Sequence, residues 1–206
     1  MLVLVSGATA TVRRLAGDPQ LGVLLTPRAR QDLAKIVASG MPWAADNDCF
    51  IRLDAPAYKR MVGAIAGLPR LLWVACPDVV ASHRRTMRRW RRWYPYLAHK
   101  RVPVAFVAQN GCTPGSIPWG QAAAIFVGGD TAWKIGPEAA AIVLEAKRRG
   151  VWVHIGRVNS AVRERHFIRL GADSFDGSKH SMFPDTYIPG TLARLSQSSM
   201  AGLFLE

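Results

Sequence analysis

Eight short apolar segments alternate along the chain with stretches of helix-forming composition, and this alternation limits the possible folds more than any other feature. Several segments, such as Leu71–Ala75, are apolar throughout, as expected for parallel strands that are covered on both faces. The alternation predicts a compact α/β fold, a (β/α)8 TIM-like barrel in one domain over residues 1–206, with an open doubly wound sheet as the alternative. The predicted strands are Leu2–Ser6, Gly22–Thr26, Trp43–Asp46, Leu71–Cys76, Val102–Ala108, Ala122–Val127, Val151–Ile155 and Ala172–Phe175.

The intervening segments predict the helices. After the last strand we expect a polar loop, Ser178–Ser181, which contains His180. A final helix begins around Thr191–Leu195, and a loose tail follows from Ser196. The other predicted helices are Arg28–Ser39, Ala55–Leu68, Ser82–Trp93, Pro137–Arg149 and Ser160–Leu170.

The charge of the chain indicates a polyanionic partner. There are 27 Lys and Arg residues against 14 Asp and Glu, a formal net charge of +13. Such an excess favours nucleic acid first and an anionic membrane surface second. The helix predicted at Ser82–Trp93 has an apolar stripe at Met87, Trp90, Tyr94 and Leu97, which places its basic side chains on the outward face. Six arginines without intervening acids repel one another unless phosphates neutralise them: Arg84, Arg85, Arg88, Arg89, Arg91 and Arg92.

Several classes of protein are disfavoured by what the sequence lacks. The three cysteines are far apart and form no C-x-x-C pair, so we expect no disulfide framework and no metal site, in a reducing, cytoplasmic setting. No apolar run reaches the roughly 18–20 residues that span a bilayer, so we expect no membrane partner. The opening segment Met1–Gly7 lacks the basic region of a signal peptide.

Polar residues and glycines stand at the ends of the predicted strands. In a barrel the carboxyl ends of the strands converge on one mouth, where active sites form. Gly129 there offers a backbone amide with no side chain in the way. The residues at or just after strand ends are Asp46, Asp78, Gln109, Gly128, Gly129, Arg157 and Asp176.

The residue types at these ends indicate a chemistry. Asp46 and Asp176 are two carboxylates on different strands, and paired carboxylates serve glycosidic-bond chemistry as nucleophile and general acid/base. Asp78 accepts hydrogen bonds when ionised and Gln109 both donates and accepts, so the pair could read the edge of a purine-like base. Phe50 could stack on a ring, with ordinary core packing as the alternative.

These segments together resemble the tRNA-guanine transglycosylase superfamily. Each motif is short, but five occur in the family's order at five strand ends. Ala45–Phe50 resembles the family's Asp-Ser-Gly-Gly-Phe segment, and Gly171–Gly177 resembles its Gly-Ile-Asp-Met-Phe-Asp strand. Three further segments resemble the aspartate that recognises the base, the Val-Gln-Gly-Gly motif and the Gly-Gly-Leu motif, namely Pro77–Asp78, Val107–Gly111 and Phe126–Gly129.

The resemblance implies roles for these residues. It implies that Asp176 attacks C1′ of the nucleoside, that Asp46 moves protons on the bases, and that Asp78 holds the base. Gln109, Gly128, Gly129 and Phe50 are implied to complete the base site. Asp48 stands where the family has a glycine and leaves the choice between Asp46 and Asp48 open.

Departures from the family narrow the expected substrate. No cysteine follows Cys112, so the family's cysteine-rich zinc subdomain has no counterpart, and Ser178–Ser181 replaces the usual Pro-Thr-Arg. The short chain resembles the often phage-encoded branch that inserts 7-deazaguanines such as preQ0 into DNA. The expected partners are DNA and a free 7-deazaguanine base, a partner protein is left open, and no cofactor is expected. The expected location is the cytoplasm, which is that of the host if the protein is phage-encoded. A tRNA-guanine transglycosylase and a non-catalytic nucleic-acid-binding barrel are the alternatives.

Overall fold

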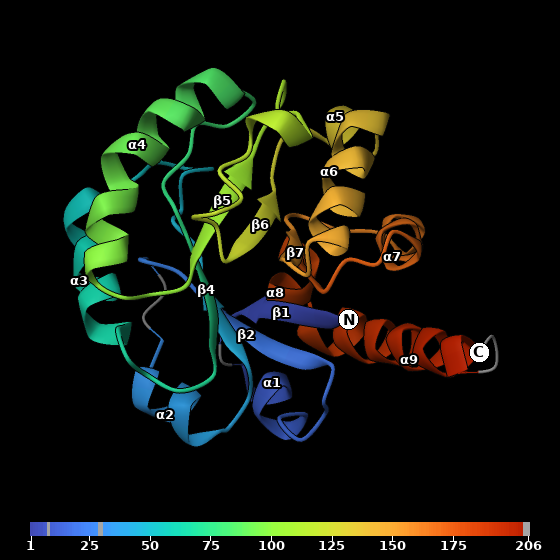
Figure 1. Ribbon diagram of the computed structural model, residues 1–206. Coiled ribbons are helices and arrows are strands. Elements are labelled where there is room, and N and C mark those ends of the chain that lie inside the picture. The colour runs from blue at the N-terminus through green and yellow to red at the C-terminus, as the bar shows by residue number, and fades with distance from the viewer. Residues whose placement is uncertain (8, 29–30, 204–206) are drawn as a thin grey trace.

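The computed structural model of the protein describes residues 1–7, 9–28 and 31–203, and in it eight parallel strands close into a barrel (Figure 1). Each strand pairs with its neighbours in chain order, and the eighth closes on the first. The predicted (β/α)8 barrel is therefore confirmed, and the open sheet is excluded. The strands are β1 (Leu2–Ser6), β2 (Leu21–Leu25), β3 (Trp43–Ala45), β4 (Leu71–Ala75), β5 (Val104–Ala108), β6 (Ala124–Val127), β7 (Trp152–Ile155) and β8 (Ser174–Asp176).

Helices connect the strands and lie outside the barrel (Figure 1). The helix between β2 and β3 differs from the prediction, because it begins at Leu33 and not at Arg28. Asp32 caps this helix by accepting a hydrogen bond from the backbone N–H of Lys35 at 3.2 Å. The helices are α1 (Ala10–Arg14), α2 (Leu33–Ala38), α3 (Ala55–Ile65), α4 (His83–His99), α5 (Thr131–Lys134), α6 (Pro137–Arg148), α7 (Ala161–Arg169), α8 (Ser178–Met182) and α9 (Pro184–Leu203), with a 3-10 turn η1 (Pro114–Ser116) after β5.

The barrel interior is filled by a few large side chains set among small ones. The rings of Trp73 and Phe126 meet edge to face with their centroids 5.6 Å apart. Ala44, Ala105 and other small residues on the facing strands leave room for them. A second, larger apolar core lies between the strands and the helices. Strand residues are thus buried on both faces, which explains why the strand segments are apolar throughout.

The basic helix α4 is longer than predicted and turns a slightly different face inward. It runs to His99 and includes Pro95, whereas the sequence predicted an end at Trp93. The predicted stripe members Met87 and Tyr94 are only half-buried. Trp93 is buried because its ring packs edge-on against Tyr58, with centroids 5.6 Å apart. The buried residues of α4 are Thr86, Trp90, Trp93 and Leu97.

Two predictions for the C-terminal region were wrong, whereas the final helix predicted around Thr191–Leu195 lies within α9. Ser178–Ser181 belongs to helix α8 and not to a loop, and the predicted tail from Ser196 continues α9 as far as Leu203. His180 is buried and shares a 2.9 Å hydrogen bond with Thr191, which donates to Glu164 at 3.2 Å. This polar network joins α7, α8 and α9 behind the end of β8. Within the described ranges, no helix has both the length and the apolar character needed to cross a membrane.

Candidate active site

A pocket opens at the carboxyl ends of the strands, where the inward-facing positions change from apolar to polar. Leu4 in the barrel interior is the register partner of Asp176, so this carboxylate continues the inward row of the sheet. The pocket has about 460 Å³ of space, part of it open to solvent. Its lining residues are Asp46, Asn47, Phe50, Asp78, Val80, Val107, Gln109, Phe126, Gly128, Gly156, Arg157 and Asp176.

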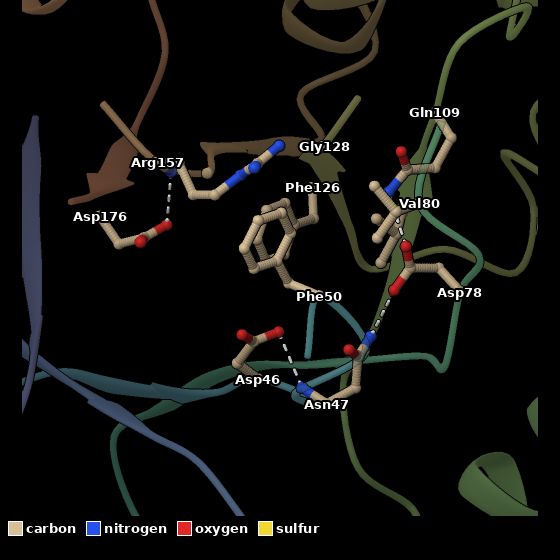
Figure 2. Close-up of a pocket in the computed structure, with 12 residues that line it drawn as sticks. Asp46, Asn47, Phe50, Asp78, Val80, Gln109, Phe126, Gly128, Arg157 and Asp176 are labelled. Atoms are coloured by element: carbon tan, nitrogen blue, oxygen red, sulfur yellow. Dashed lines mark hydrogen bonds between the residues drawn. The ribbon is translucent and has the colours of Figure 1, made fainter. Parts of the chain in front are cut away.

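The pocket has two polar ends with aromatic rings between them. Figure 2 shows Asp176 and Asp46 on one side and Asp78 with Gln109 on the other. Phe50 and Phe126 lie between these two groups. Most of the residues predicted from strand ends are therefore brought together in one cavity, where Asp46 and Asp176 are separated from Asp78 and Gln109.

Asp176 is held through one of its two carboxylate oxygens. Its Oδ1 accepts a hydrogen bond from the backbone N–H of Arg157 at 3.1 Å and lies 3.1 Å from Nε2 of His154. Its side chain is 18% exposed, so the group reaches the pocket. Arg157 has a φ of 59°, a left-handed conformation that is costly for a residue with a side chain. This backbone turn directs the N–H toward Asp176. Within the described chain, no hydrogen bond engages Oδ2 of Asp176.

Asp46 is a carboxyl group whose environment favours the protonated form. Burial, and then the negative charge of Asp176, raise the pKa of Asp46 from 3.8 to about 8. Its Oδ1 accepts a hydrogen bond from the backbone N–H of Asn47 at 2.7 Å, which opposes the rise only in part. At neutral pH Asp46 thus carries a proton that it can give to a bound molecule.

Asp48 is occupied elsewhere, which bears on the choice between it and Asp46. Its Oδ2 accepts the backbone N–H of Arg28 at 3.2 Å and lies 3.8 Å from the guanidinium of the same residue. Asp48 has a φ of 57°, and the backbone N–H groups of Ile51 and Arg52 both bond to its carbonyl oxygen. Asp48 therefore organises the turn that carries Phe50, and Asp46 is the residue that lines the first pocket.

Asp78 is a buried acceptor that two side-chain amides hold in place. Its Oδ1 accepts from Asn47 at 2.9 Å and its Oδ2 accepts from Gln109 at 2.6 Å. Burial raises the pKa of Asp78, whereas these hydrogen bonds favour the ionised form. Gln109 cannot be flipped without loss, because its Oε1 accepts the N–H groups of Ala81 and Gly129, each at 2.8 Å.

The two glycines after β6 have different roles. Gly128 lines the pocket, and a Cβ at this position would lie 2.5 Å from Nε2 of Gln109, so only glycine allows that amide its place. Gly129 was predicted to offer a free backbone amide to a base. The structure corrects this prediction, because the amide already donates to Oε1 of Gln109.

Phe50 and Arg157 meet across the top of the pocket. Phe50 is 61% exposed, so the alternative of core packing is wrong for this residue. The guanidinium carbon of Arg157 lies 4.2 Å from the centre of the Phe50 ring, in a cation–π contact. The guanidinium also donates to the carbonyl oxygen of Gly129 at 2.6 Å. One face of Phe50 is therefore covered by a side chain that a bound ring would have to displace.

The arginines of α4 do not form one uniform surface. Arg84, Arg85, Arg88, Arg91 and Arg92 are exposed, as predicted. Arg89 is half-buried, and its guanidinium donates to the carbonyl oxygen of Asp78 and approaches the sulfur of Cys49 at 3.4 Å. The prediction that Arg89 faces outward was therefore wrong. Arg89 supports the amide-bearing end of the pocket from behind.

A second chamber adjoins the first pocket on the side of β1, β2 and α8. It has about 860 Å³ of space, part of it open to solvent, and shares Asp46, Phe50, Arg157 and Asp176 with the first pocket. Hydroxyl groups of Ser6, Thr26, Ser178 and Ser181 are among its other lining groups. Asp46 and Asp176 thus lie at the boundary between the first pocket and this second chamber.

Sequence reasoning missed two residues of this region, Asn47 and His154, and placed Lys134 here only by its position near a strand end. Asn47 orients Asp78, His154 contacts Asp176, and buried Lys134 donates its Nζ hydrogen to the carbonyl oxygen of Gly156. Burial lowers the pKa of Lys134 to about 8. His154 left a signal in the sequence, since it is a polar residue in an apolar strand, two positions before Gly156 and therefore on the same face.

The fold and the pocket define the protein as a parallel (β/α)8 barrel with two carboxylates and a buried amide-held acid at the carboxyl ends of its strands. No protein-family model matches the chain, and no curated protein matches its sequence. In the part of the chain that the structure describes, no group of three or more His, Cys, Asp or Glu residues is placed to hold a metal ion.

Proposed function

We propose that the protein is a DNA guanine transglycosylase, which exchanges guanine in DNA for a free 7-deazaguanine base of the preQ0 type. The observation that carries the proposal is the order of groups across the pocket. Asp176 and Asp46 stand at one end, Phe50 in the middle, and Asp78 at the other end. A guanine nucleoside has a matching order, with its C1′–N9 bond at one end and its N1–H and N2 donors at the other.

The first half of the reaction breaks the bond between guanine and deoxyribose. Oδ2 of Asp176, which makes no hydrogen bond in the described chain, attacks C1′ as the C1′–N9 bond breaks. The bonding electrons leave with guanine, and protonated Asp46 supplies the proton that neutralises the departing base. The products are free guanine, a glycosyl ester on Asp176, and an ionised Asp46.

The second half reverses these steps with the new base. Ionised Asp46 takes the proton from N9 of the incoming 7-deazaguanine, whose N9 then attacks C1′. The C1′–O bond breaks, and its electrons return to Asp176 as a carboxylate. Asp46 ends protonated, so both residues return to their initial state and no other reactant is consumed. Retention of configuration follows from the two displacements.

Access to the pocket requires that the target nucleotide leave the base stack. Its reactive C1′ must lie at the mouth of the barrel, between the first pocket and the second chamber, which both contain Asp46 and Asp176. The exposed arginines of α4 provide positive charge for the phosphates on either side. α4 follows β4 directly, so its N-terminal arginines lie on the mouth side of the barrel.

The direct test is base exchange. Purified protein is incubated with preQ0 and either guanine-containing DNA or tRNA, and the nucleosides are then analysed by mass spectrometry. We expect a 7-deazaguanine deoxynucleoside from DNA. Asp176→Asn is expected to lower the exchange rate by at least about 10³-fold and to leave DNA binding intact. Asp54→Asn is the matched control, because Asp54 caps α3 away from the pocket and asparagine caps equally well.

Each other outcome has a distinct meaning. Incorporation only into tRNA would keep the chemistry and replace the substrate. Full exchange by Asp176→Asn would overturn the assigned nucleophile. Salt-sensitive DNA binding, without exchange whichever free base is supplied, would favour a non-catalytic nucleic-acid-binding barrel.

A further inference from the structure

His154 is a completely buried histidine that lies beneath the reactive carboxylate. It is 0% exposed and projects from β7 into the barrel interior. Its ring centre is 4.6 Å from the rings of both Trp73 and Phe126. A polar ring in such an apolar place is costly unless both of its nitrogens are hydrogen-bonded. Both are bonded here, and one of the partners is Asp176.

The bonds of His154 belong to a chain of four side chains that begins at Trp152 and ends at Asp176. The indole N–H of Trp152 donates to Oγ of Ser174 at 2.9 Å. The same Oγ lies 2.9 Å from Nδ1 of His154, and Nε2 of His154 lies 3.1 Å from Oδ1 of Asp176. Ser174 is the register partner of His154 on the neighbouring strand, so the sheet itself fixes this contact.

The chemistry of the partners decides where the imidazole proton resides. A lone pair on Nε2 would face the lone pairs of the Asp176 carboxylate, so Nε2 must carry the hydrogen. Ser174 already accepts from the indole, and its own hydroxyl hydrogen can then go to Nδ1. Burial lowers the pKa of His154 against the opposing effect of Asp176, and the nearby Lys134 lowers it further. The imidazole is thus neutral, with its hydrogen on Nε2.

We propose that His154 is a positioning residue for the reactive carboxylate: its Nε2–H and the backbone N–H of Arg157 together hold Oδ1 of Asp176, so that Oδ2 faces the sugar. This inference rests on the proposed transglycosylase function. In the glycosyl intermediate, Oδ1 is the carbonyl oxygen of the ester. When the C1′–Oδ2 bond breaks, its electrons pass to the carboxylate, whose negative charge both oxygens share, and the two N–H groups stabilise the share on Oδ1.

The position of the two donors predicts an unequal effect on the two halves of the reaction. Donors on a carboxylate assist its departure more than its attack, because its charge grows on departure and falls on attack. Loss of the Nε2–H is therefore expected to slow breakdown of the intermediate more than its formation. A variant without this donor should accumulate the covalent protein–DNA adduct, whereas general damage to the fold would lower the adduct and the turnover together.

The test compares His154→Leu, which removes the donor at similar volume, with His154→Gln, whose amide can donate in its place. We expect His154→Leu to lower turnover by about 10²–10³-fold, to leave the KM for the base unchanged, and to raise the adduct fraction seen on denaturing gels. His154→Gln should restore at least about tenfold of the lost rate. His99→Leu is the matched control, because His99 is exposed at the far end of α4.

A second measurement does not depend on turnover. In protein labelled with 15N at histidine, the His154 resonance is identified by its absence from the His154→Gln spectrum. We expect the pattern of a neutral ring protonated at Nε2, unchanged between about pH 6 and pH 8. A ring protonated at Nδ1, or one that titrates in this range, would overturn the proposed bond.

The outcomes separate this inference from the function on which it rests. Exchange by the wild-type protein together with wild-type turnover and adduct levels in His154→Leu would overturn the role of His154 alone. Absence of exchange by the wild-type protein on DNA and on tRNA would overturn the transglycosylase function and the positioning role with it.

Discussion

Asp46 should lower the stability of the folded protein at neutral pH, and its replacement by asparagine should raise it. The environment that raises the pKa of Asp46 to about 8 favours the neutral carboxyl group, and the unfolded chain keeps the ordinary value of 3.8. Between these two values the unfolded chain releases a proton that the folded protein retains. The free-energy cost is therefore absent below about pH 4, grows as the pH rises, and is complete above about pH 8.

The magnitude follows from the difference in pKa. At pH 7 the gap from the ordinary value is about three pH units, and at about 1.4 kcal/mol per unit the upper limit is about 4 kcal/mol. Asp46 is only half-buried, and water at the mouth screens part of this cost. We therefore expect Asp46→Asn to gain about 2 kcal/mol, a rise in Tm of roughly 4–8 °C for a domain of this size.

Thermal unfolding at pH 4.5 and pH 7.5, followed by circular dichroism, measures this effect. Asparagine can still accept the Asn47 N–H through its side-chain oxygen, so the local backbone is preserved. Asp54→Asn serves as the control and should leave Tm nearly unchanged at both pH values. An Asp46→Asn variant no more stable than wild type at pH 7.5, or one equally stabilised at pH 4.5, would refute the reasoning.

Three further predictions concern single side chains. Arg88→Ala should weaken DNA binding and reduce the slope of log affinity against log salt concentration by about one. Arg89→Ala should instead raise the KM for the base, because Arg89 contacts Asp78. Equal salt slopes for the two variants would contradict these different roles. Glu164→Gln should lower the free energy of unfolding by about 2 kcal/mol, because it leaves the guanidinium of Arg194 on α9 without its charge partner. An unchanged midpoint of urea unfolding would count against this prediction. Gly128→Ala should raise the KM for the base about tenfold by displacing Gln109, with Tm little changed, and an unaltered KM would show that the amide is dispensable.

The order of the strands and the positions of the pocket residues could be read from the sequence because both depend on local patterns. Parallel strands buried on both faces require continuous apolar segments, and such segments are visible without a structure. A closed barrel brings all strand ends to one mouth, so Asp46, Asp78, Gln109 and Asp176 could be placed together before their distances were known. The boundaries of helices were less certain, because α8 is a short polar segment, and the buried contacts of His180 and Glu164 that join α7, α8 and α9 link residues distant in the chain.

What only the tertiary structure decided is which partners each polar group finds. The sequence shows six arginines on one helix, but only the packing of α4 on the barrel turns Arg89 inward to Asp78. The sequence places Gly129 at a strand end, but the register between β5 and β6 gives its amide to Gln109. His154 lies 22 residues from Asp176 in the chain and reaches it because β7 and β8 are neighbours. Local patterns specify which faces are buried, whereas hydrogen bonds between distant residues exist only once the barrel has closed.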